Sequence, residues 1–231
     1  METLAPALLK IFGIIWINVI LSGDNAVVIA LACRGLPESK RRVGMLLGAG
    51  VAVVLRIVFT VLVASLLSTP FLKIVGGALL LWIAVKLLLE EDSEDGAIKE
   101  TDRLWNAVWT VAIADAVMSL DNVLAIAAVA KDSTLLLVLG LAISIPLIVA
   151  GAALIMAILE RAPVLVWAGA GLLGWVAGDM ILSDPWLVGR LGEETAHWAE
   201  MPVAVLATVF VLATAFLLRR NSVAERAWRQ Q

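Results

Sequence analysis

The chain has 231 residues, of which 62% are hydrophobic, and its mean hydropathy is +1.01. A soluble domain averages about 45–50% apolar residues, so this composition argues against a soluble protein and leaves little chain for a soluble domain. The formal charge of −3, without a basic tract, gives no indication of a nucleic-acid partner, and the single cysteine excludes an internal disulfide and any multi-cysteine metal site.

Seven apolar segments follow one another along the chain. Each is near or above the ~20 residues that a helix needs to cross the hydrocarbon core of a bilayer. The segments cover residues 6–33, 43–68, 71–89, 104–130, 134–159, 163–183 and 202–218. The first is far longer than the roughly 7–15 apolar residues of a signal peptide, so we expect it to be retained as a helix. The sequence therefore predicts an all-α, polytopic protein with seven transmembrane helices in a single transmembrane domain, residues 1–231.

Prolines mark several of the expected helix ends. Pro70, Pro163 and Pro202 stand at the starts of segments, where a missing amide hydrogen costs little. Pro146 lies within segment 134–159, where it is expected to kink the helix; a hinge at this residue is the alternative interpretation. The only histidine, His197, falls in a polar stretch that we interpret as a solvated loop.

The distribution of lysine and arginine predicts the orientation in the membrane. If the N-terminus faces outward, the inner side receives twelve of these residues and the outer side receives four. The inner set is Arg34, Lys40, Arg41, Arg42, Lys86, Lys99, Arg103, Arg161, Arg219, Arg220, Arg226 and Arg229, and the outer set is Lys10, Lys73, Lys131 and Arg190. This asymmetry follows the positive-inside rule. We therefore expect a protein of the cell inner (plasma) membrane whose N-terminus is outside and whose C-terminus is cytoplasmic.

The second half of the chain repeats the first in two separate stretches. The first match pairs Asn18-x-x-x-Ser22-x-Asp24-Asn25 with Asp115-x-x-x-Ser119-x-Asp121-Asn122, at an offset of 97 residues (121 − 24). A second series of matches begins at Pro70 and Pro163, at an offset of 93 (163 − 70). Three helices per copy is an odd number, so the second copy must enter the membrane from the opposite face. The sequence predicts two inverted repeats, about 6–89 and about 104–183, and an extra helix over about 202–218.

Three aspartates, Asp24, Asp115 and Asp121, lie inside apolar segments. An ionised carboxylate at the bilayer centre costs at least about 2.5–3.5 kcal/mol, so these side chains must face the bundle interior and be paired, protonated or metal-bound. Arg56 is the only basic residue at comparable depth, and one arginine cannot neutralise three aspartates. In one interpretation Arg56 pairs with one aspartate, the other two are protonated, and the asparagines join helices. In the other, the surplus negative charge binds a cation.

The motif side chains also indicate which cation they would bind. Carboxylate, amide and hydroxyl oxygens are hard donors that suit Mg²⁺, Ca²⁺ or Mn²⁺, and the absence of His and Cys from both motifs weighs against zinc and copper. Asp24 and Asp121 each lie about 16 residues, or roughly 24 Å, into their helices from opposite faces, so they can meet near the midplane. No tightly bound cofactor is expected, because the cation would be the substrate.

At these motifs the sequence resembles the TerC family of integral membrane proteins, particularly its YjbE-like branch. The resemblance covers roughly residues 6–218 and rests on Ser22-Gly23-Asp24-Asn25-Ala26, Ser119-Leu120-Asp121-Asn122-Val123 and Arg56. The family is related to the LysE-like transporters, so the resemblance implies export of a divalent metal, chiefly manganese. It also implies that Asp24, Asn25, Asp121 and Asn122 are metal ligands, with Asp115 and Asn18 beside them.

These observations lead us to expect a transporter, not an enzyme, that exports Mn²⁺ by alternating access. H⁺ or Na⁺ is the expected counter-ion, because an inside-negative membrane potential opposes cation export, and Arg56 is expected to pair with an aspartate until metal displaces it. The alternatives are an exporter of a small cationic or zwitterionic metabolite, and a non-transporting scaffold that helps to load metal into secreted proteins. An intramembrane hydrolase is least favoured, since neither a His/Cys pair nor an HExxH motif is present.

Overall fold

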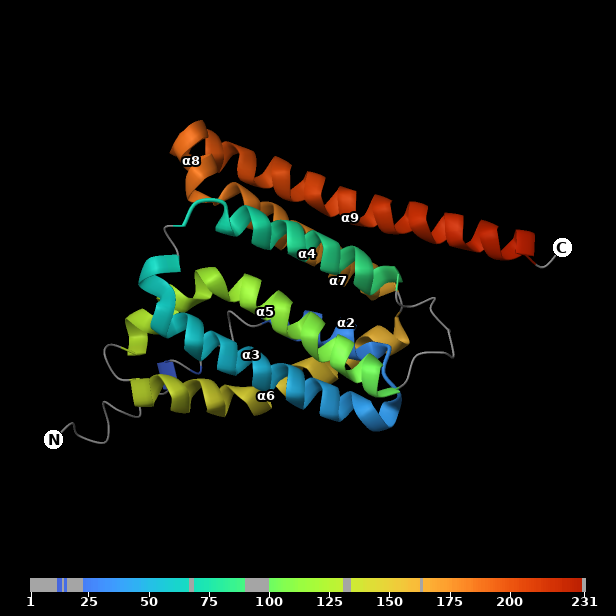
Figure 1. The fold of residues 1–231 in the computed structure, drawn as a ribbon, viewed down its shortest axis with the longest axis horizontal. Helices are drawn as coiled ribbons and strands as arrows, with labels where there is room; N and C mark the ends of the chain where they lie inside the picture. Colours follow the sequence, from blue (N-terminus) through green and yellow to red (C-terminus); the bar gives the residue numbers. More distant parts are fainter. Residues whose placement is uncertain are drawn as a thin grey trace. The chain divides into compact units, whose positions relative to one another are not determined.

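The computed structural model describes residues 12–13, 15, 23–66, 69–89, 100–130, 134–162 and 164–229. The side chains of 60–66, 100, 120–130, 134–137, 140 and 221–229 are outside this description. All regular elements in the described ranges are helices, which confirms the all-α, polytopic prediction (Figure 1). They are α2 (Gly23–Arg34), α3 (Glu38–Leu66), α4 (Leu72–Leu89), α5 (Glu100–Ala130), α6 (Thr134–Arg161), α7 (Val164–Leu182), α8 (Pro185–Leu191) and α9 (Glu193–Arg229).

Five stretches of the described chain are long and apolar enough to cross a membrane. They are Glu38–Phe59, Leu72–Leu89, Leu141–Arg161, Val164–Leu182 and Glu193–Arg220. Such helices imply a lipid bilayer as the surroundings of the protein. The predicted segment 6–33 falls partly on residues outside the description, as do the side chains of 120–130 in segment 104–130, so the count of seven spans stays a prediction.

The helices form two compact units, each of which combines segments from both halves of the sequence. Unit 1 consists of residues 1–69 and 98–160, and unit 2 consists of residues 70–97 and 161–231. Unit 1 thus contains α2, α3, α5 and nearly all of α6, while unit 2 contains α4, α7, α8 and α9. The inverted repeats and the single domain remain predictions.

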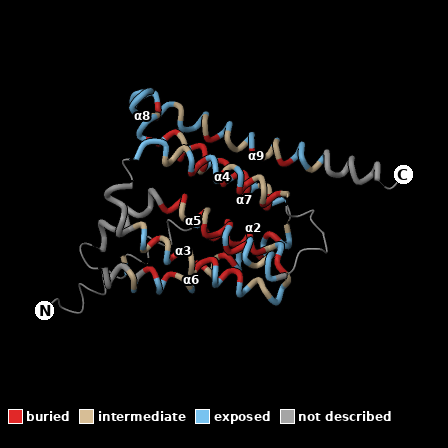
Figure 2. The backbone as a smooth tube through the Cα atoms, in the orientation of Figure 1, coloured by how far each residue is buried: buried red, intermediate tan, exposed pale blue. Residues whose placement is uncertain are grey.

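In unit 1, α3 and α5 run parallel and pack closely. A Cβ atom at Gly48 of α3 would lie 3.1 Å from the side chain of Val111 of α5, so the absence of a side chain lets the two helices approach. Further along both helices, Arg56 of α3 contacts Asp115 and Ser119 of α5. The short helix α2 packs against both and is buried over most of its length (Figure 2). Three helices therefore enclose the polar side chains of this unit.

In unit 2, α7 packs against both α4 and α9, and α4 also contacts α9. Gly174 and Gly178 allow the contact with α9, because a Cβ atom on either would come within 2.9 Å of α9 backbone carbon. Small residues at such spacing let transmembrane helices approach closely. Much of the apolar surface of α9, by contrast, is exposed, as expected for a helix that faces lipid (Figure 2).

The C-terminal part of the chain differs from the prediction. The extra helix does not begin at Pro202: α9 starts at Glu193 and includes Pro202 in its interior. The residues before the proline favour a helix, and two glutamates in the first turn interact well with its dipole. His197 is therefore helical and not in a loop, although it is exposed as expected, with Nδ1 3.3 Å from Oε2 of Glu200. The predicted loop also contains α8.

Asp184, a residue that the sequence analysis did not single out, joins two helix N-termini in unit 2. Its buried carboxylate caps α8 by accepting a hydrogen bond of 2.9 Å from the amide of Trp186. It also accepts hydrogen bonds from the amides of Phe71, at 3.1 Å, and Lys73, at 3.1 Å, at the start of α4. The first amides of a helix have no partner within the helix, so one carboxylate satisfies donors from two helices.

We expect Asp184→Ala to destabilise the protein by about 2–4 kcal/mol, because it removes a helix cap and leaves buried amide donors without an acceptor. Asp184→Asn, which keeps one acceptor oxygen, should cost less. Thermal unfolding in detergent measures both effects, with Ser183→Ala as the neighbouring control. Equal stability of the wild type and Asp184→Ala would contradict a capping role.

Candidate metal site

The candidate site lies in unit 1, where α2, α3 and α5 contribute polar side chains. Asp24 and Asn25 stand in the first turn of α2, Arg56 lies within α3, and Asp115 and Ser119 lie one turn apart on α5. Asn25 is nine residues before the end of α2 at Arg34, or about 14 Å along the helix axis. This distance is about half of the ~30 Å thickness of a hydrocarbon core, and the position of the site near the midplane stays a prediction.

Among the described residues, Arg56, Asp115 and Ser119 form a buried network. Nη2 of Arg56 donates to Oδ1 of Asp115 at 2.6 Å, and Nε donates to Oγ of Ser119 at 3.0 Å. Oγ of Ser119 in turn donates to Oδ2 of Asp115 at 3.0 Å. Arg56 is 1% exposed and Asp115 is 5% exposed. Hence Arg56 neutralises Asp115, and the expectation that it pairs with one of the aspartates is confirmed for the described residues.

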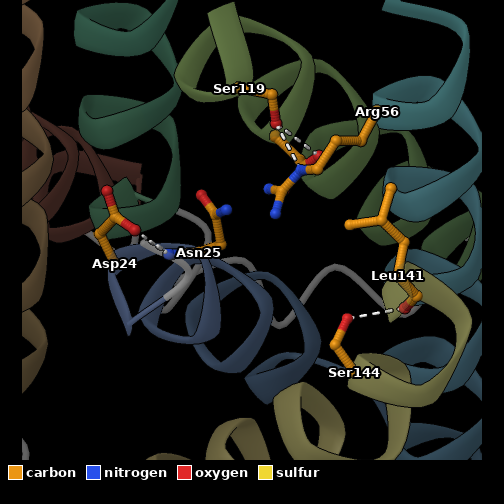
Figure 3. A network of polar contacts seen from close by, with 7 residues as sticks. Asp24, Asn25, Arg56, Ser119, Leu141 and Ser144 are labelled. Atoms are coloured by element: carbon orange, nitrogen blue, oxygen red, sulfur yellow. Dashed lines mark hydrogen bonds and ion pairs between the residues drawn. The ribbon is translucent and has the colours of Figure 1, made fainter. Parts of the chain in front are cut away.

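Asn25 is buried next to this network, yet its side chain makes no hydrogen bond to any described residue. The residue is 3% exposed, and both Oδ1 and Nδ2 lack a partner in this part of the chain. Figure 3 shows its carboxamide and the Arg56 guanidinium facing one another. Buried amides nearly always have partners, since an unsatisfied one costs about 1–3 kcal/mol. Both the Oδ1 acceptor and the Nδ2 donor of Asn25 are therefore buried and unsatisfied among the described residues.

Asp24 supplies a second carboxylate to the same region. Its Oδ1 accepts a hydrogen bond of 2.9 Å from the backbone amide of Asn25, and it lies close enough to Arg56 and Asp115 to interact with their charges (Figure 3). No lysine or arginine among the described side chains forms a salt bridge with Asp24. Asp115 is thus paired with Arg56, whereas Asp24 makes no ion pair among the described side chains.

The space between the network and α2 is narrow. It is bordered by Asn25, Val28, Ile29, Val111 and Asp115, and it is too small for a water molecule. A hydrated cation therefore does not fit in this space.

The structure brings together three of the six predicted ligands, Asp24, Asn25 and Asp115, together with the charge partner Arg56. Asn18, and the side chains of Asp121 and Asn122, lie outside the described residues. Within the description, no group of three His, Cys, Asp or Glu residues is placed to hold a metal ion. The backbone of α5 is helical throughout its length, so it is not unwound at the second motif.

Ser119, the serine of the second motif, takes part in this network. It is fully buried and contacts both members of the ion pair. Its spacing of four residues from Asp115 was the available signal, because residues i and i+4 lie on one face of a helix. What the spacing does not reveal is that α3 presents Arg56 to that face.

Comparison with known proteins places the chain in a family. Residues 4–223 match the model described as "Integral membrane protein TerC family". The chain is similar to three proteins of Bacillus subtilis (strain 168). It is 39% identical to the "Uncharacterized membrane protein YjbE" over 88% of this chain and 93% of that protein, and 27% identical to the "Uncharacterized membrane protein YceF" over 86% and 76%.

The third relative, the "Uncharacterized membrane protein YkoY", is 27% identical over 71% of this chain and 56% of that protein. No solved structure matches the chain. The family model covers nearly the whole chain, and so does the alignment with YjbE. This protein is therefore a member of the TerC family of integral membrane proteins.

Proposed function

We propose that this protein is a secondary transporter that exports a divalent metal cation, chiefly Mn²⁺, from the cytoplasm. One observation carries the proposal: the buried, unsatisfied carboxamide of Asn25 lies between Asp24 and the Arg56–Asp115 ion pair. A cation at this position would accept the lone pair of Oδ1 and balance the Asp24 carboxylate. Membership of the TerC family and the resemblance to metal exporters favour the same function.

The chemistry of the donors supports a hard cation. Asp24 and Asp115 offer carboxylate oxygens and Asn25 offers an amide oxygen, the donors that Mg²⁺, Ca²⁺ and Mn²⁺ prefer. Charged groups inside a membrane commonly belong to ion pathways. In the proposed cycle, Arg56 occupies Asp115 in the absence of metal, and the arriving cation competes with the guanidinium for that carboxylate. The choice of Mn²⁺ among the hard cations comes from the family resemblance.

Alternating access suits the directions of the helices. In unit 2, Gly77 near the start of α4 lies against Ala177 and Ile181 near the end of α7, so these helices are antiparallel. α4 and α7 are the third helices of the two proposed copies. Corresponding helices of inverted repeats run in opposite directions, so this antiparallel arrangement is the one that inverted repeats require. We propose that the copies move about the midplane site and expose it to each side in turn, with the N-terminus outside and the C-terminus cytoplasmic.

The driving force must come from an ion gradient. The membrane potential is worth ~2.3 kcal/mol per charge per 100 mV, and its inside-negative sign opposes the exit of a cation. Exchange for H⁺ or Na⁺ would overcome this opposition. Imposing a pH or sodium gradient across proteoliposomes is therefore expected to change the rate of metal movement.

The direct test is metal flux in proteoliposomes that contain the purified protein and a metal-sensitive dye. We expect movement of Mn²⁺ that exceeds that of Mg²⁺, Ca²⁺ and Zn²⁺ and that saturates with concentration. A small cationic amino acid that competes with Mn²⁺ would instead favour metabolite export. Absence of any flux, in protein shown to be folded, would overturn transport and favour a scaffold that loads metal into secreted proteins.

A further inference from the structure

One end of unit 1 is held together by the side chain of Arg41. Its guanidinium forms an ion pair with Glu160 at the end of α6. It also donates from Nε to the carbonyl of Leu36, at 3.0 Å, and from Nη2 to the carbonyl of Arg34, at 3.3 Å. The last carbonyls of a helix lack partners within it and carry partial negative charge, so Arg41 caps α2 while it holds α6.

Two of the three helices that meet at Arg41 are firmly joined without Glu160. The turn from α2 to α3 is closed by backbone hydrogen bonds from Leu36 to Cys33, at 3.1 Å, and from Lys40 to Pro37, at 2.8 Å. Just beyond it, α3 presents Gly44, where a Cβ atom would lie 3.2 Å from Sγ of the buried Cys33. The hairpin of α2 and α3 therefore moves as one piece.

Helix α6 is packed through its side chains, and after Pro146 its inner face is buried at Ala152, Met156 and Leu159. In the described part of the chain, it approaches no other helix closely over an extended length, and a Cβ atom at Gly151 would lie 3.9 Å from Ala26 of α2. Its interior contains Pro146, which cannot donate a helical hydrogen bond. Nearby, Oγ of Ser144 donates to the carbonyl of Leu141 at 2.6 Å (Figure 3). Such a proline is a site where a helix bends.

We propose that the Arg41–Glu160 ion pair is the latch of a gate, and that the half of α6 after Pro146 swings away from the α2–α3 hairpin when it breaks. The proposal rests on the proposed transport function and on the predicted orientation, which puts this end of unit 1 at the cytoplasmic face. Arg41 lies 15 residues before Arg56 on the same helix, or about 22 Å along its axis. The latch is thus separate from the metal site and would control access to it.

The test measures the distance between α6 and α3 directly. In the full chain with Cys33→Ala, cysteines replace the exposed Arg42 and Arg161 and carry spin labels for double electron–electron resonance in liposomes. We expect mainly a short distance in this background. Adding Glu160→Gln should raise the ratio of the long-distance to the short-distance population about two- to fivefold, the effect of losing a partly exposed ion pair.

Matched variants separate the latch from a general effect of charge. Lys40→Gln removes a neighbouring positive charge and should leave the distances unchanged. Glu160→Gln should have no further effect in an Arg41→Gln background, because the pair is already broken. The latch would be overturned if the distances in Glu160→Gln were unchanged, or if Lys40→Gln shifted them as much as Glu160→Gln does. It would also be overturned if Glu160→Gln shifted the distances equally in the wild-type and Arg41→Gln backgrounds.

Sidedness and transport are measured separately. An impermeant maleimide should label the cysteine at position 42 from the cytoplasmic side of sealed vesicles, and labelling from the outside would overturn the gate's assignment to the cytoplasmic face. The distances are recorded without metal, so they do not depend on the flux assay. If Glu160→Gln shifts the distance populations but the wild-type protein moves no metal, the proposed function is wrong and the latch stands. If the wild-type protein moves metal but Glu160→Gln leaves the distances unchanged, the function stands and the latch is wrong.

Discussion

Asp24→Asn is expected to abolish Mn²⁺ export and leave the protein in the membrane. The substitution keeps the shape of the side chain and removes the carboxylate, which makes no ion pair among the described side chains. Loss of an outer-sphere group typically costs about 10–100-fold in metal affinity or activity, so loss of a direct ligand should cost at least as much. The measurements are the initial rate of manganese flux in proteoliposomes and the manganese tolerance of cells that produce the variant.

Asp179→Asn is the matched control for Asp24→Asn. Asp179 also lies in an apolar helix, but it is exposed and belongs to α7 in unit 2. Its amide variant should export manganese at close to the wild-type rate. If Asp24→Asn transports as well as Asp179→Asn at equal membrane levels, Asp24 is not a ligand and the proposed site is wrong.

Arg56→Gln should be the most destabilising single substitution in unit 1. It leaves Asp115 buried without its positive partner and removes the donor to Ser119. Breaking a buried ion pair on one side costs about 3–5 kcal/mol, because the remaining charge is left uncompensated. Thermal unfolding in detergent should show a large drop for Arg56→Gln and substantial recovery in Arg56→Gln/Asp115→Asn.

The double variant also separates a structural role from a functional one. If the pair only holds α3 against α5, the double variant should recover transport together with stability. If Asp115 is a ligand that Arg56 occupies between transport cycles, the double variant should be stable and still fail to move manganese. If the double variant recovers both stability and transport, Asp115 is not a ligand. Asp24 and Asn25 would then be the proposed ligands among the described residues.

Much of the fold follows from apolar runs, and the exceptions have local causes. The predicted segments locate α3, α4, α6 and α7 well because lipid and helix contacts impose the same long apolar pattern. The predicted start of α9 was wrong because Pro202 was interpreted as a helix boundary. Residues that favour a helix precede the proline, and the helix continues through it. The cap at Asp184 was visible in principle, since Asp followed by Pro is typical of a helix start.

The candidate site could be predicted in composition but not in pairing. Sequence shows that one arginine and three aspartates lie deep within apolar segments, and the motif spacing puts Asp115 and Ser119 on one face of a helix. It does not show which aspartate meets Arg56, because that depends on the register of α3 against α5, set in part by the close approach at Gly48. The unsatisfied carboxamide of Asn25 is likewise a property of packing.

The interleaving of the two units has a consequence for biogenesis. Asp115 follows Arg56 by 59 residues, so the ribosome delivers α3 to the membrane before the partner of its buried guanidinium has been synthesised. A lone arginine in the hydrocarbon core is costly, so α3 carries an unbalanced charge until α5 arrives. Unit 1 is complete only when α6 has been inserted as well, so a nascent chain that stalls between the two halves presents an unassembled, charged helix to the quality-control proteases.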